Sequence, residues 1–157
     1  MDKALQQKLL FAQTRSGRVA SLTVSGVSMN PTLYEGDIVT IKKADEYTPG
    51  DILVFVYKSG ELLIHRLLKK NMRYFCKGDN ALRLEDVEAE QIAGKVVLVN
   101  NIPPEPWPEW KIQLSLDVNR MFRACRYDID KTKSSDVYRH YADAIFGGKT
   151  EPSESLR

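Results

Sequence analysis

The sequence is short of several features whose scarcity excludes whole classes of protein. It has only two cysteines, Cys76 and Cys125, which lie far apart and lack the spacing of a metal-binding pair. A disulfide framework and a zinc site are therefore excluded, and two buried thiols are expected. No run approaches the roughly 20 apolar residues that span a bilayer. The first eleven residues are too polar for the core of a signal peptide. These absences predict a cytoplasmic protein with no metal and no cofactor.

An excess of charge of one sign is also missing. The 157 residues carry 23 basic and 21 acidic side chains, for a net charge of +2. A nucleic-acid-binding protein is expected to show a strong basic excess, so no nucleic-acid partner is predicted. With 43% hydrophobic residues, the chain has enough apolar material for one core, and its length suits one domain with a small appendage.

The first hundred residues read as a mainly β domain. A short amphipathic helix is expected over 2–15. After it come short apolar or β-branched runs separated by turns rich in glycine, proline and aspartate. These runs fall at 18–24, 38–41, 52–57, 61–68, 72–76 and 92–99. An acidic connector is expected over 85–91. This pattern predicts an antiparallel, coiled or barrel-like sheet over 1–100.

The composition changes after residue 100. A stretch rich in proline and tryptophan, 101–110, predicts a stiff, extended connector. Apolar residues then recur at three- and four-residue spacing, which predicts a helical segment over 111–148, with 149–157 as a tail. Two interpretations of Trp107 and Trp110 stay open. They pack against the core, or they form an aromatic patch at a membrane interface.

The candidate chemistry begins at Ser28, in the stretch Ser25–Leu33. Pro31 stiffens the chain just after this serine, and Gly26 lets another backbone approach it closely. Ser28 is either an ordinary turn residue or a nucleophile, and a serine nucleophile needs a base. His65 lies within an apolar strand, where a structural role is the alternative to a catalytic one. The other histidine, His140, reads as a surface residue of a helix.

The order of several short motifs around these residues is informative. They are Ser-Met-Asn-Pro-Thr-Leu at 28–33, Gly-Asp at 36–37, Pro-Gly-Asp-Ile-Leu-Val-Phe at 49–55, His-Arg at 65–66, Lys-Gly-Asp-Asn at 77–80 and Ile-Ala-Gly-Lys-Val at 92–96. Together they resemble the type I signal peptidases and the related self-cleaving LexA-type repressors. The resemblance covers about residues 22–99 and implies a signal-peptidase-type catalytic β domain.

The resemblance also implies roles for particular residues. The general base of this superfamily is usually a lysine directly before an arginine, and His65 occupies that position here. This is similar to the histidine-type branch found in endoplasmic-reticulum and archaeal signal peptidases. Lys69 and Lys70 fall outside the matched position. Asp79 would orient His65, with a turn residue as the alternative interpretation, and Asp86 is a weaker candidate for a second acid.

The oxyanion hole implied by the resemblance rests on backbone groups. Many relatives place a serine hydroxyl two residues before the nucleophile, but Gly26 stands at that position here. The backbone N–H of Ser28 would then be the main donor. Met29 fits the family motif and is expected to pack beneath the site. Gly26, Ser28 and Met29 are thus the candidate oxyanion and substrate-binding residues.

Two functions follow as expectations. The first is a soluble serine endopeptidase that cleaves a leader or signal-like peptide within a peptide or protein substrate, with peripheral membrane contact as a further option. The second is a non-catalytic peptide-binding protein that keeps the peptidase fold. A LexA-type repressor is disfavoured, because only 27 residues precede Ser28 and no Ala-Gly or Cys-Gly bond lies upstream of it. The sequence does not indicate an oligomeric state.

Overall fold

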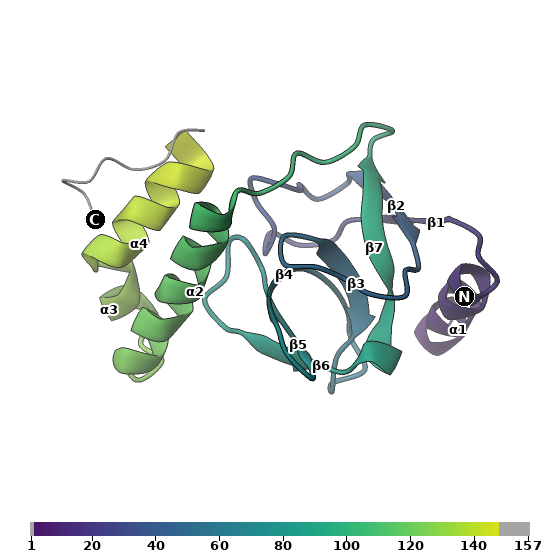
Figure 1. Ribbon diagram of the computed structural model, residues 1–157, viewed down its shortest axis with the longest axis horizontal. Coiled ribbons are helices and arrows are strands. Elements are labelled where there is room, and N and C mark those ends of the chain that lie inside the picture. Colours follow the sequence, from purple (N-terminus) through teal and green to yellow (C-terminus); the bar gives the residue numbers. More distant parts are fainter. Residues whose placement is uncertain (1, 148–157) are drawn as a thin grey trace.

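A seven-stranded antiparallel sheet forms the centre of the computed structural model, which describes residues 2–147 (Figure 1). Its spatial order is β1-β2-β7-β3-β4-β5-β6. The strands are β1 (Ala20–Thr23), β2 (Ile38–Lys42), β3 (Ile52–Val56), β4 (Leu62–Lys70), β5 (Tyr74–Lys77), β6 (Glu85–Val87) and β7 (Ile92–Val99). The predicted mainly β, antiparallel fold is confirmed.

The sheet is curled rather than flat. The register shifts at three places, between Thr40 and Ile41, between Val54 and Phe55, and between Leu67 and Lys69. Such bulges bend a strand and increase its local twist. The curl brings residues from both ends of the strand order toward one another, which is why distant parts of the sequence meet at one site.

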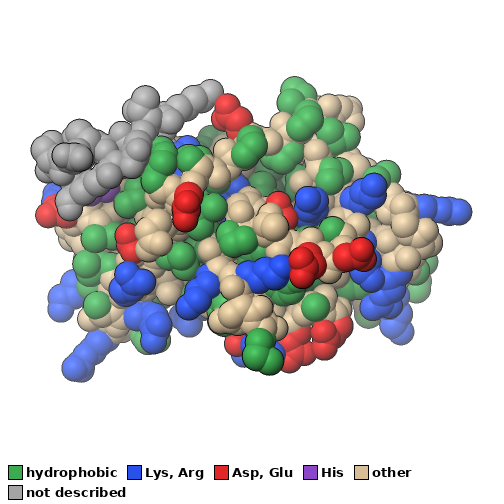
Figure 2. Space-filling view, viewed as in Figure 1, with side chains coloured by type: hydrophobic (Ala, Val, Ile, Leu, Met, Phe, Trp, Pro, Cys, Tyr) green, Lys and Arg blue, Asp and Glu red, His purple; other side chains and the backbone are tan. Residues whose placement is uncertain are grey.

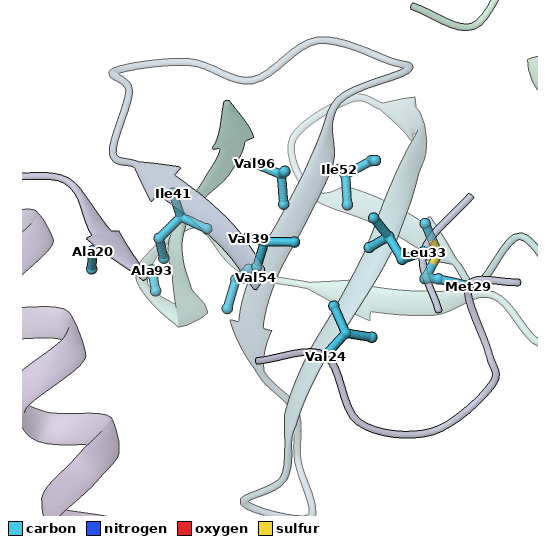
Figure 3. Packing of buried hydrophobic residues seen from close by; sticks show 10 residues of the cluster. All are labelled: Ala20, Val24, Met29, Leu33, Val39, Ile41, Ile52, Val54, Ala93 and Val96. Atoms are coloured by element: carbon cyan, nitrogen blue, oxygen red, sulfur yellow. The ribbon is translucent and has the colours of Figure 1, made fainter. Parts of the chain in front are cut away.

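Two apolar clusters fill the β domain, one on each face of β3. Ile52 and Val54 point into the first cluster, which also receives Met29 and Leu33 from the chain between β1 and β2 (Figure 3). Leu53 and Phe55, the alternate residues of β3, point into the second cluster. Because β3 is buried on both faces, its sequence is continuously apolar rather than alternating.

The second cluster contains Cys76, and burial raises the pKa of its thiol. Cys125 is only partly buried, so the expectation of two buried thiols is wrong for this residue. A buried thiol surrounded by apolar side chains is a packing group with little reactivity.

Helices lie on two sides of the sheet (Figure 1). Helix α1 (Lys3–Arg15) packs beside β1 and β7, and Leu10 and Phe11 contact the first apolar cluster. At the other side lie α2 (Glu109–Ala124), α3 (Ile129–Lys133) and α4 (Asp136–Ala142), which continues into a π-helical turn, η2 (Asp143–Gly147). The side chain of Ser135 accepts a hydrogen bond from the Tyr138 N–H, so Ser135 caps the start of α4.

One expectation about the fold needs correction. The segment 85–91, expected as an acidic connector, contains strand β6 and a short 3₁₀ helix, η1 (Ala89–Gln91). Strand β6 pairs with β5, so that Glu85 and Val87 are buried and Asp86 is partly exposed. The expected tail, 149–157, lies outside the described residues.

The surface carries charge of both signs. Acidic and basic side chains are interspersed over the face shown in Figure 2. Among residues 2–147, no helix has the length and apolar character required to cross a bilayer.

Candidate active site

Ser28 lies in the long turn between β1 and β2, and its neighbours fix the turn to the core. Met29 and Leu33 are buried in the first apolar cluster, and the Leu33 N–H donates to the Met29 carbonyl over 2.9 Å. The Asn30 N–H closes a tighter turn onto the Val27 carbonyl over 3.1 Å. Ser28 itself remains partly exposed. The apolar residues therefore anchor the loop, while the serine between them stays accessible.

His65 connects this serine to an acid on another strand. It lies in β4, and only 6% of its surface is exposed. Its Nε2 atom is 3.0 Å from Ser28 Oγ, and its Nδ1 atom is 2.7 Å from Glu85 Oε1. Glu85 is the first residue of β6 and is also buried. We call these three candidate catalytic residues, Ser28, His65 and Glu85, the catalytic row.

The acid at one end of this row sets the proton position on the imidazole. A carboxylate can only accept hydrogen bonds, so the Glu85 contact places a proton on Nδ1 of His65. In the neutral ring, Nε2 then has a free lone pair and accepts from the Ser28 hydroxyl. This is the arrangement that a serine nucleophile and its general base require. The structure thus brings the predicted Ser28 and His65 together.

The expected contact between Asp79 and His65 is wrong. Asp79 is fully buried, but its carboxylate accepts from Arg66 Nε over 3.0 Å and from Arg66 Nη2 over 2.9 Å. Thr32 Oγ1 donates to the same carboxylate over 2.5 Å. The Asp79 carboxylate is therefore bonded to Arg66 and Thr32. The partner of His65 Nδ1 is Glu85 instead.

Asp86 is also not a second acid of the site. Its Oδ1 atom accepts from Arg73 Nε over 2.5 Å at the surface, and Arg73 bonds Glu88 as well. Successive residues of a strand point to opposite faces, so in β6 Glu85 turns toward His65 and Asp86 turns away. The sequence interpretation was one residue from the acid that the structure supplies.

The lysines near the site do not contact Ser28. Lys69 is exposed and lies over the Phe75 ring, and Lys70 pairs with Glu46. Lys77 is fully buried, and this burial lowers the pKa of its ammonium group to about 7, a value that would suit a general base. Its Nζ atom, however, donates to Ser115 Oγ over 2.8 Å and to the Gly78 carbonyl over 3.2 Å. Of these candidate bases, His65 is the one whose ring nitrogen lies within hydrogen-bond distance of Ser28 Oγ.

The candidate oxyanion residues occupy different environments. Within the described part of the chain, the Ser28 N–H donates to no other residue, so it is available to a ligand. Gly26 is exposed with φ at +83°, a conformation that favours glycine, and its N–H donates to Glu35 Oε1 over 3.2 Å. Met29 is buried, and its Sδ atom accepts from the Asp79 N–H over 3.3 Å. Met29 thus packs beneath the serine turn.

Sequence reasoning missed two contributors to the surroundings of the site, Glu85 and Tyr141, and left the place of a third, Trp107, open. Glu85 lies in the segment expected as an acidic connector, and Glu-Asp-Val at 85–87 shows no apolar alternation that would signal a strand. Trp107 lies over Arg66, with the guanidinium carbon 3.9 Å from the ring centroid, a contact that agrees with the packing interpretation of this residue, while membrane contact of Trp107 and Trp110 stays a prediction. Tyr141 reaches the site region from α4, and no sequence pattern indicates that contact.

Comparison with known proteins gives one family. The model of the family described as peptidase S24-like matches residues 2–97. That range contains β1 to β6 and most of β7, and it includes all three members of the catalytic row. No curated protein matches the chain.

Proposed function

Because the chain belongs to the peptidase S24-like family, we propose that it is an active serine peptidase in which Ser28 is the nucleophile, His65 the general base and Glu85 the acid that orients His65. One observation carries the proposal. The two hydrogen bonds of the His65 ring, 3.0 Å to Ser28 Oγ and 2.7 Å to Glu85 Oε1, join all three side chains in a single row. The site needs no cofactor for this chemistry.

The row supports a two-step acyl transfer. Ser28 Oγ attacks the carbonyl carbon of the substrate while its proton passes to Nε2 of His65. The imidazolium then gives this proton to the leaving amine, so that the C–N bond breaks and an acyl-enzyme remains. Water, deprotonated by the same nitrogen, hydrolyses the ester. Glu85 stabilises the imidazolium in each step, because its carboxylate stays 2.7 Å from Nδ1.

The negative oxygen of the tetrahedral intermediate needs donors. The free N–H of Ser28 is the donor that supports this role, and Gly26 adds no hydroxyl. A preorganised backbone donor of this kind is worth on the order of 10²–10³ in rate. We infer that the hole relies on backbone groups alone.

The substrate we propose is an extended leader or signal-like peptide. This finer claim rests on the resemblance of the motifs to the signal peptidases, together with the exposure of the chain at 25–27, directly before the nucleophile. An extended peptide would lie there as an added strand, bonded through its main chain. Small residues before the cleaved bond follow from the same resemblance.

A fluorophosphonate probe tests the core of the proposal without knowledge of the substrate. The wild-type full chain should be labelled, and peptide mass spectrometry should locate the adduct on Ser28. Ser28→Ala should abolish labelling. Ser25→Ala is the matched control, because this exposed serine lies in the same turn and contacts no member of the catalytic row. His65→Ala should slow labelling by on the order of 10²–10⁴.

The same experiment separates the two candidate functions. A folded wild-type chain that resists the probe, yet binds peptides equally well with and without Ser28→Ala, would favour the non-catalytic peptide-binding protein. Labelling that persists in Ser28→Ala would remove this serine as the nucleophile. For the substrate, a peptide library cut by the wild type and left intact by Ser28→Ala would give the residues around the scissile bond.

A further inference from the structure

The loop 77–80 connects the serine turn to the C-terminal helices. On the serine side, the Asn80 N–H donates to the Ser28 carbonyl over 2.8 Å, and Asn80 Nδ2 donates to the Val27 carbonyl over 3.2 Å. Gly78 is packed so closely there that a Cβ atom would lie 2.6 Å from the Ser28 carbonyl oxygen and 3.1 Å from His65 Nε2. The backbone of this loop therefore forms one wall of the site.

The other side of the loop is held by α4 and α2. The Tyr141 hydroxyl, from α4, donates to the Asp79 carbonyl over 2.6 Å, and Tyr141 is 1% exposed. Lys77 Nζ contacts Ser115 of α2 over 2.8 Å and the Tyr141 hydroxyl over 3.4 Å. Burial raises the pKa of the Tyr141 phenol, so the hydroxyl keeps its proton and remains a donor. These helices lie beyond the residues that match the family.

The hydrogen bond from Tyr141 and the hydrogen bond to the Ser28 carbonyl involve the same peptide unit. The Asp79 carbonyl and the Asn80 N–H belong to the same planar amide, which cannot rotate about its C–N bond. The Tyr141 hydroxyl donates a hydrogen bond to the oxygen of this amide, and the N–H of the same amide donates to the Ser28 carbonyl. A carbonyl that accepts a hydrogen bond polarises its amide and strengthens the N–H as a donor. The contact from α4 thus reaches the nucleophile through a single rigid group.

We propose that Tyr141 is a positioning residue for the nucleophile, acting through the Asp79–Asn80 peptide that its hydroxyl holds against Ser28. This inference rests on the proposed function. It assigns the C-terminal helices a part in the site, since the family-matched domain does not itself supply the donor for the Asp79 carbonyl.

Tyr141→Phe removes the hydroxyl and leaves the ring, with its edge contact to Trp107 and its position beneath Lys77. The first-order rate of Ser28 labelling at saturating fluorophosphonate should fall about tenfold, as expected for one lost hydrogen bond. The half-saturating probe concentration should change less than twofold and the pH at half-maximal rate by less than about 0.3, because His65 and Glu85 keep their partners. Exchange of the Asn80 amide hydrogen, followed by NMR, should accelerate by about tenfold as well.

Ser115→Ala is the control for a purely structural effect. It removes a partner of Lys77 and the long 3.4 Å contact of Ser115 Oγ with the Tyr141 hydroxyl, but it leaves the 2.6 Å bond from Tyr141 to the Asp79 carbonyl in place. Per folded molecule, its labelling rate and Asn80 exchange should match the wild type.

The outcomes separate this inference from the proposed function. Wild-type labelling that Tyr141→Phe leaves unchanged per folded molecule would overturn the positioning role while the peptidase stands. An unlabelled wild type would overturn the peptidase proposal. The Asn80 exchange would still decide whether Tyr141 holds the Asp79–Asn80 peptide in place. Exchange faster in Tyr141→Phe than in Ser115→Ala would support the link, and equal exchange in the two variants would refute it.

Discussion

Two buried polar clusters originate from neighbouring residues of β4 and differ in nearly every physical respect. His65 belongs to the catalytic row with Ser28 and Glu85. Arg66, the next residue, points to the opposite face and bonds Asp79, beside Lys77, and we call Arg66, Asp79 and Lys77 the sealed cluster. All three of its members are at most 1% exposed. The catalytic row, by contrast, ends in the partly exposed Ser28.

The two clusters also differ in how far they are shielded from solvent and substrate. Trp107 and Tyr141 close over the sealed cluster from the connector and from α4, so no substrate reaches it. A buried ion pair of this kind is not strong evidence for stability, but removing one partner is costly because a charge is left unpaired. The catalytic row is open at Ser28, and the loop 77–80 lies between it and the sealed cluster, bonded to the Ser28 carbonyl on one side and to the Tyr141 hydroxyl on the other.

The substitution with the largest expected effect on this comparison is Glu85→Gln. The amide has nearly the shape of the carboxylate but cannot stabilise an imidazolium, and it allows the wrong proton position on His65. We expect the labelling rate of Ser28 to fall by on the order of 10²–10⁴, with a smaller change in the unfolding midpoint. The measurement pairs probe labelling with denaturant unfolding of the same sample.

Asp79→Asn is the corresponding substitution in the sealed cluster. It breaks the sealed cluster by leaving Arg66 without its anion, and a loss of about 3–5 kcal/mol in unfolding free energy is expected. Its effect on labelling, per folded molecule, should be much smaller than that of Glu85→Gln. If instead Asp79→Asn abolishes labelling of folded protein while Glu85→Gln does not, the roles of the two acids are reversed.

The contrast between these acids also shows what sequence reasoning achieves. Ser28 and His65 are 37 positions apart, and ordered motifs were enough to pair them. The choice of acid failed, because Asp79 stands in a conspicuous Gly-Asp-Asn turn and Glu85 in a strand of three residues. Whether an acid in that strand faces His65 depends on its pairing with β5, a tertiary fact.

Most of the fold could be predicted from the sequence for a similar reason. Turn residues and β-branched runs are local signals, and they located six of the seven strands, with β6 left inside the expected connector. The C-terminal helices were indicated by their apolar spacing, yet the place where they pack was not. That place is set by single contacts, such as the Tyr141 hydroxyl on the Asp79 carbonyl, for which helical periodicity carries no information.

A second test uses the charge of the sealed cluster. Burial lowers the pKa of Lys77 from its ordinary value of 10.5 to about 7. Between these values the unfolded chain binds a proton that the folded chain does not, so the energetic penalty for burying the ammonium is complete below pH 7 and disappears as pH rises to 10.5. The unfolding free energy of the wild type should therefore rise, relative to Lys77→Met, by up to about 1.4 kcal/mol per pH unit in this window.

Denaturant unfolding of both proteins from pH 6 to 9.5 measures this difference, in which the titration of other groups largely cancels. Parallel curves for the two proteins would show that Lys77 keeps an ordinary pKa, and that the sealed cluster is more hydrated than its burial indicates. A rising difference would sharpen the comparison, since the cluster that excludes substrate would then also exclude water.

The smallest expected effect belongs to Asp86→Asn, which tests how local the catalytic row is. Asp86 is adjacent to Glu85 in sequence, but its partner is Arg73, and both side chains are substantially exposed. Exposed ion pairs of this type contribute little, so the labelling rate should stay within about twofold of the wild type. A loss comparable to that of Glu85→Gln would mean that the strand turns its other face to His65, and the assignment of Glu85 would fail with it.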